Sequence, residues 1–70
     1  MNLDTAKNII KKEIGVFHSF YYRGTRNQSE SFKGVIFKVY PSIFVIHSDD
    51  GKVLSFSYND FIVKNFLIIS

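Results

Sequence analysis

Tyr40-Pro41-Ser42-Ile43-Phe44-Val45-Ile46 predicts a strand that begins after a proline. After a polar turn, a second segment predicts a neighbouring strand and a helical turn: Leu54-Ser55-Phe56-Ser57-Tyr58-Asn59-Asp60-Phe61-Ile62. Pro41 has no backbone N–H and therefore belongs at a strand boundary. Asp50-Gly51 is typical of a hairpin turn, because these residues tolerate positive backbone angles. We predict strands at residues 43–47 and 53–57, with the large side chains of the second strand facing the core, and then one helical turn capped by Asn59 or Asp60.

Two further strands are predicted upstream of this pair. Residues 16–23 alternate, with Phe20 on one face and Phe17 on the other, so bulky side chains occupy both faces and the second face needs partial cover. The polar, glycine-bearing residues 24–30 read as a loop. Residues 32–40 form the next strand, in which Val35, Phe37 and Val39 alternate against Lys33 and Lys38 with partial regularity and Gly34 permits a bend or bulge.

The two ends of the chain complete the predicted fold. Apolar residues recur every three to four positions over residues 3–14, which indicates a short amphipathic helix that stops at Gly15. Residues 62–69 supply a fifth strand. A helix followed by five short antiparallel strands fits one mainly β domain over residues 1–70, a small SH3-like (Sm-like) barrel in which curling the sheet pairs its edges.

Composition favours a small cytoplasmic protein without disulfide bonds. The chain has 70 residues, 46% of them hydrophobic, and no cysteine, so a disulfide framework is excluded. Its apolar runs are far shorter than the roughly 20 residues needed to cross a bilayer, and charged residues interrupt the N-terminus, which excludes a secretory signal. The net charge of +3 divides into +4 over residues 1–40 and −1 over residues 41–70.

At Tyr40–Ile46 and Ser55–Ile62 the sequence resembles the Veg family of biofilm formation stimulators from low-GC Gram-positive bacteria and their relatives. Gly34-Val35-Ile36 fits the family's strand entry, and the N-terminal helix also corresponds, so the resemblance approaches the whole chain. It implies an SH3-like barrel, no enzymatic activity, and regulation of transcription of biofilm-matrix genes by affecting a repressor protein. The sequence departs from the family between its first two strands, where Arg23, Gly24 and Arg26 are what is left of a denser glycine and basic cluster.

No catalytic, metal or cofactor motif accompanies these elements. His18 and His47 are the only histidines, and a metal site would need both of them with carboxylates at spacings that the sequence lacks. Asp49-Asp50-Gly51 lacks the regular acidic spacing of a calcium loop. The serines have no nucleophile elbow or phosphate loop around them. We therefore expect a protein that is not an enzyme and that binds no cofactor or metal.

Two kinds of binding remain open. A protein-interaction module would offer a strand edge or an aromatic patch to a regulatory partner or to a second copy of the chain. A nucleic-acid-binding barrel would instead use basic side chains beside exposed aromatic rings. The candidate residues for a partner or nucleic acid are Arg23, Arg26, Lys33, Lys38, Tyr21, Tyr22 and Tyr40.

The C-terminal strand bears on self-association. Residues 66–69 are apolar at every position, so we expect this strand to be covered on both faces. Its cover is either the N-terminal helix or another subunit, and a homo-oligomer would form through an exposed strand edge.

Overall fold

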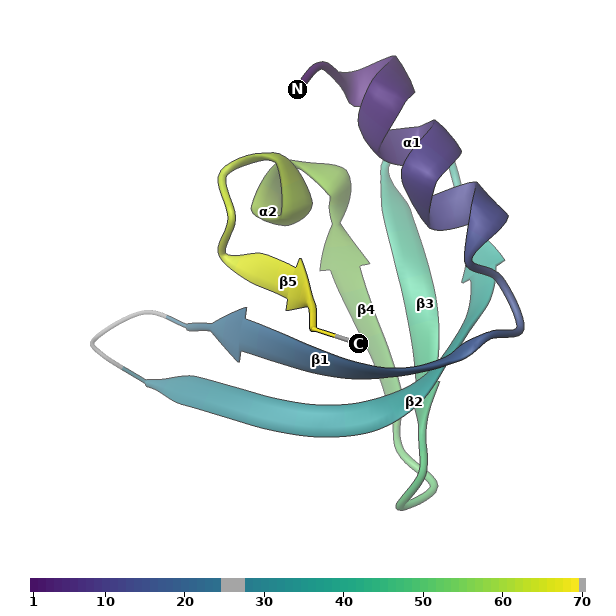
Figure 1. Ribbon diagram of the computed structural model, residues 1–70, viewed down its shortest axis with the longest axis vertical. Coiled ribbons are helices and arrows are strands. Elements are labelled where there is room, and N and C mark those ends of the chain that lie inside the picture. Colours follow the sequence, from purple (N-terminus) through teal and green to yellow (C-terminus); the bar gives the residue numbers. More distant parts are fainter. Residues whose placement is uncertain (25–27, 70) are drawn as a thin grey trace.

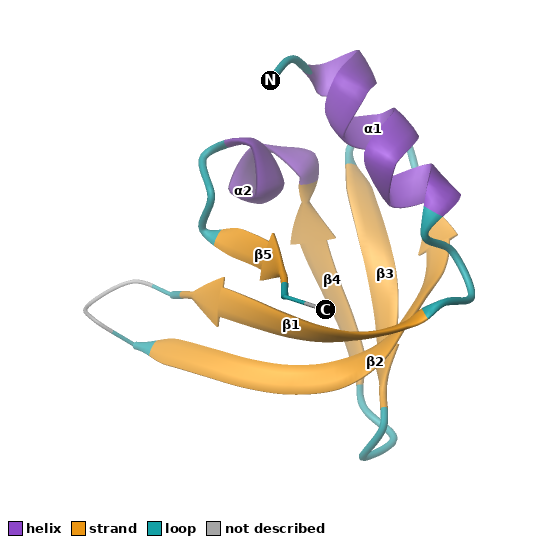
Figure 2. Cartoon of the chain, viewed as in Figure 1, coloured by secondary structure: helices purple, strands orange, loops and turns teal. Residues whose placement is uncertain are grey.

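The computed structural model describes residues 1–24 and 28–69 of the chain. A helix opens the chain, four strands follow, and a second short helix precedes the last strand (Figures 1 and 2). The elements are α1 (Leu3–Lys12), β1 (Phe17–Arg23), β2 (Ser29–Val39), β3 (Ile43–Ser48), β4 (Val53–Ser57), α2 (Tyr58–Ile62) and β5 (Phe66–Ile68).

All strands belong to one sheet in the order β4-β3-β2-β1-β5, and every neighbouring pair is antiparallel. The predicted class is thereby confirmed: a mainly β domain of five antiparallel strands with an N-terminal helix. In the described part of the chain no pairing joins β4 to β5, so the sheet is open and the predicted barrel closure is not confirmed.

The long strand β2 bends and takes part in both halves of the sheet, pairing with β1 along its first part and with β3 along its second (Figure 1). The bend depends on Gly34, because a Cβ atom there would lie 2.3 Å from the carbonyl oxygen of His47. A bulge between Ile36 and Lys38 follows. It turns Ile36 and Val39 inward and leaves Phe37 outside with 55% of its surface exposed, so the simple alternation predicted for this strand is wrong.

Aromatic side chains fill the space inside the bent sheet. The ring of Phe66 on β5 lies 5.4 Å from Phe20 on β1, 5.1 Å from Phe44 on β3 and 4.7 Å from Phe56 on β4, measured between ring centroids. Rings at these separations attract one another beyond the burial of their area. The fully buried core consists of Ala6, Ile10, Phe20, Ile36, Phe44, Ile46, Tyr58 and Phe66.

Helix α1 packs against α2 and β2. Asn2 caps it by accepting a hydrogen bond from the Thr5 backbone N–H at 2.8 Å, and Gly15 (φ +82) allows the chain to turn into β1. Only Ala6 and Ile10 of the expected apolar stripe are buried, whereas Leu3 and Ile14 are exposed. The helix therefore covers one end of the sheet with a narrow contact.

Several predicted boundaries shift. β2 begins at Ser29, inside the predicted loop, because residues 29–31 pair with β1. Residues 62–65, predicted as strand, contain the end of α2 and a turn in which Lys64 has a φ of 66°. The N-cap of α2 is Ser57, whose side chain accepts from the Asp60 N–H, and not Asn59 or Asp60.

The N-terminal helix does not cover β5 on its second face, whereas cover by another subunit stays a prediction. Phe66 is buried, but Leu67 and Ile69 are 38% and 58% exposed. The reason is that α1 packs on α2 and β2 and leaves the outer side of β5 uncovered.

We predict that Gly34→Ala destabilises the protein by about 1–3 kcal/mol, the usual range for overpacking, because the added methyl group meets the β3 backbone and no flexible side chain that could move away. Urea unfolding followed by circular dichroism measures the loss. Gly24→Ala is the matched control, since its Cβ would meet its nearest atom at 3.4 Å. Equal stability of the two variants would refute the importance assigned to this contact.

Candidate interaction surfaces

Three of the predicted binding residues share the outer face of the sheet, the face turned away from the core. Tyr21 and Arg23 alternate with the buried Phe20 on β1 and therefore point outward. Lys33 on β2 pairs with Ser19, two positions before Tyr21, so the aromatic ring and the two cations lie over neighbouring strands. We call Tyr21, Arg23 and Lys33 the basic patch.

The remaining candidates lie elsewhere. Lys38 and Tyr40 lie at the other end of β2, where the lysine Nζ is 5.2 Å from the centroid of the tyrosine ring. Tyr22 is not an exposed platform, because it packs against the core with its ring 4.9 Å from Phe56. Arg26 lies outside the described residues. Of the six predicted residues that the structure describes, three lie together in the basic patch, Lys38 and Tyr40 lie together elsewhere, and Tyr22 packs against the core.

A second surface on the outer face was not among the predicted sites. Phe17 pairs with Val35, Val35 with His47, and His47 with Val53, which makes one row across β1, β2, β3 and β4. Phe37 stacks on His47 with ring centroids 4.1 Å apart. The exposed fractions are 57% for Phe17, 55% for Phe37 and 67% for Val53. We call these five residues the outer aromatic row.

The sequence contained one signal for this row. Phe17 falls on the second face of its predicted strand, a face that was expected to need partial cover. The sequence gives no such signal for Phe37, because its side chain lies on the outer face of the sheet as a result of the bulge in β2. His47, considered as a metal ligand, instead provides a ring for Phe37.

His18 holds the end of α1 against β1. Its Nε2 lies 2.8 Å from Oε2 of Glu13, and only 13% of the histidine side chain is exposed. The ring also lies edge-on to Phe20, with centroids 5.9 Å apart. Within residues 1–24 and 28–69, no three His, Asp or Glu side chains gather as a metal site would require. His18 is therefore placed as part of the packing between the helix and the sheet.

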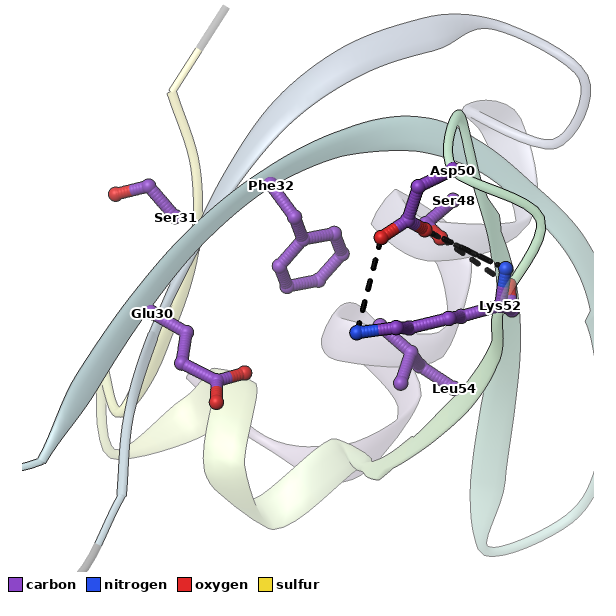
Figure 3. A pocket seen from close by; sticks show the side chains of 7 residues that line it. All are labelled: Glu30, Ser31, Phe32, Ser48, Asp50, Lys52 and Leu54. Carbon is purple, nitrogen blue, oxygen red and sulfur yellow. Dashed lines mark hydrogen bonds and ion pairs between the residues drawn. The ribbon is translucent and has the colours of Figure 1, made fainter.

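A pocket of about 300 Å³ opens between the start of β2 and the β3–β4 hairpin. Asp50 accepts a hydrogen bond from the Ser48 hydroxyl, and the Lys52 ammonium lies 3.7 Å from the other carboxylate oxygen (Figure 3). The Phe32 ring and the Leu54 side chain give the hollow an apolar wall. The lining residues are Glu30, Ser31, Phe32, Ser48, Asp50, Lys52 and Leu54.

The hairpin beside this pocket is a three-residue loop, Asp49 to Gly51, in which Gly51 has a φ of +88. The Ser48 hydroxyl, donating to Asp50, is the main cause that lowers the pKa of this carboxyl below its usual value; Lys52 lowers it further. These contacts explain the polar side of the pocket as part of the turn.

In the described ranges, no helix has the length and apolar character needed to span a membrane.

A protein-family model described as "Biofilm formation stimulator VEG" matches residues 1–68 of the chain. No curated protein matches it.

We predict that Asp50→Asn makes stability less sensitive to acid. A carboxyl whose pKa is lower in the folded state contributes stability above its unfolded pKa, and this contribution disappears as the pH falls through the folded pKa. Melting temperatures measured from about pH 7 down to about pH 3 should therefore fall less for the variant than for the wild type. Asp49→Asn is the control, because this side chain makes no hydrogen bond to a described residue, and its melting temperature should fall with pH as that of the wild type does. If the melting temperature of Asp50→Asn falls as much as that of the wild type, the prediction is contradicted.

Proposed function

The chain belongs to the biofilm formation stimulator VEG family, and we propose that it is a small regulatory protein that acts through contact with another protein. Family membership gives a biofilm-related regulatory role. The proposed mechanism is regulation of transcription of biofilm-matrix genes, in the cytoplasm, by binding a regulatory protein such as a repressor. The chain performs no catalysis in this mechanism.

The observation that carries this proposal is the outer aromatic row. Exposed aromatic and apolar residues that lie side by side are typical of surfaces that bind proteins, because burying them in a complex removes apolar area from water. The row is also built on a sheet, so binding costs little conformational entropy. Phe17 and Phe37 are its largest exposed side chains, and both would be natural anchors for a partner.

We further propose that the open sheet is a variant of the SH3-like barrel. The support is the long β2 strand, which pairs with β1 on one side of its bend and with β3 on the other, so that two layers enclose one aromatic core. In such a small barrel the strands present their outer faces and edges to partners.

The basic patch favours a second candidate function, nucleic-acid binding. Lys33 and Arg23 offer charge to phosphates, and Tyr21 between them could stack on a base. The patch is small, and Tyr21 is half-buried. We therefore rank it below protein contact.

The two candidates predict different outcomes for surface variants. In cells that lack the native copy, we expect Phe17→Ser/Phe37→Ser to lower the effect on matrix-gene transcripts by at least about tenfold, the size expected when an anchor worth about 1.4 kcal/mol is lost. Arg23→Ala/Lys33→Ala is the matched control, also at two side chains on the outer face. Transcripts are measured by quantitative PCR at equal protein levels, with circular dichroism to verify folding.

Full regulation by the aromatic variant would contradict the proposal. Loss of regulation in Arg23→Ala/Lys33→Ala alone would instead indicate that the protein acts by binding nucleic acid.

A further inference from the structure

We propose that the free edge of β4 is a self-association site, at which the β4 strands of two copies pair antiparallel around a two-fold axis at Ser55. This inference rests on the sheet alone and does not depend on the proposed function. The second copy would extend the sheet without a break.

The backbone of β4 points alternate residues toward this edge. Ser48 donates its backbone N–H to the Lys52 carbonyl at 2.9 Å, so these two residues face each other as a hydrogen-bonded pair. Hydrogen-bonded and non-bonded pairs alternate along an antiparallel ladder. Leu54 and Phe56 therefore bond to β3, whereas the N–H and C=O groups of Val53 and Ser55 and the N–H of Ser57 point away from it. The Ser57 carbonyl is not free, because Ser57 is the N-cap of α2 and its carbonyl accepts the first hydrogen bond of that helix.

This edge carries none of the usual protections against pairing. Edge strands are commonly blocked by a charge, a proline or a bulge. β4 has the sequence VLSFS and its pairing with β3 is regular from Val53 to Ser57, so it has none of the three. Ser55 is small and exposed, which allows a second backbone to approach. The edge is an open template for another strand.

The directions in which the side chains point favour β4 of the second copy, and not its β5, as the strand that pairs with the β4 edge. On β5, Ile69 donates to the Ser19 carbonyl at 2.8 Å, so by the same alternation the groups left free belong to Phe66 and Ile68, whose side chains face inward. Antiparallel pairing of β4 with that edge would place outward residues opposite inward ones. Two β4 strands instead match outer face to outer face, with Val53 opposite Ser57 of the second copy.

Charge and burial also fit a two-fold pair. Residues 53–59 carry no charge, so a chain with a net charge of +3 can approach its copy here without placing like charges in contact. The axis at Ser55 brings Lys52 toward the first turn of the second copy's α2, which contains Asp60. On the inner side, Phe56 comes beside Leu54 of the second copy, and both side chains are only half-buried in the single chain.

The contact is small. The Ser55 pair makes two backbone hydrogen bonds, and each Val53–Ser57 pair makes one, since the Ser57 carbonyl is engaged in α2. The total of about four is fewer than the roughly ten of a standard interface. We therefore expect a dimer that dissociates on dilution.

Sedimentation velocity and amide hydrogen exchange, both measured from micromolar to millimolar protein, test this directly. We expect a monomer–dimer equilibrium in which the amides of Ser55 and Ser57 gain protection as the dimer forms, while Leu54 and Phe56 are protected throughout. A monomer at every concentration would overturn the proposal, as would protection that appears at Phe66 and Ile68 instead.

Ser55→Pro isolates the edge, because it removes an outward N–H and breaks no bond to β3. It should weaken dimerisation at least tenfold, whereas Ser55→Ala keeps the N–H and should dimerise as the wild type does. A dimer of Ser55→Pro as stable as that of the wild type would overturn the proposal. If the proline variant does not fold, the exchange pattern of the wild type still decides the question.

Discussion

The close approach of β2 to β3 at Gly34 is the constraint on which the rest of the structure depends. With a Cβ position 2.3 Å from the His47 carbonyl oxygen, only glycine fits there, and the strand can bend across its neighbour. The bend turns one continuous sheet into two layers, and the aromatic rings of four strands meet between them. The β2 bulge then turns Phe37 outward onto His47. The core and the outer aromatic row are thus two consequences of one distorted strand.

The same sheet separates two kinds of surface. The basic patch lies over β1 and β2, near the β5 edge, and the outer aromatic row crosses toward β4. Apolar contact with a protein and electrostatic contact with phosphates would therefore use different residues, which makes the two proposed functions separable by substitution. The uncharged β4 edge adjoins the row through Val53, so a second copy and a regulatory partner would occupy neighbouring parts of the molecule.

Local chemistry explains which features could be predicted from the sequence. Pro41 and Gly51 mark the turns on either side of β3, and the alternation in residues 53–57 gave β4 its exact bounds. Pairing with a distant strand is not encoded locally, so the extension of β2 to Ser29 and the shortening of β5 to Phe66–Ile68 were missed. For the same reason, exposure of Leu67 depends on where α1 packs. Of the candidate surfaces, the three residues of the basic patch were among the seven named from the sequence, but that they share one face follows from strand pairing. The bulge that decides the place of Phe37 has no unambiguous sequence signal.

We propose that this member of the VEG family regulates through contact with a protein and not through binding of nucleic acid. Fluorescence anisotropy of labelled single-stranded RNA, single-stranded DNA and duplex DNA, titrated with the purified protein over a series of salt concentrations, tests it most directly. We expect no binding in the micromolar range at physiological salt, and only weak, non-specific binding at low salt. Micromolar binding that weakens steeply with salt, as the release of counterions from phosphate contacts requires, and that disappears in Arg23→Ala/Lys33→Ala would show that the basic patch binds nucleic acid and would refute the proposed mechanism.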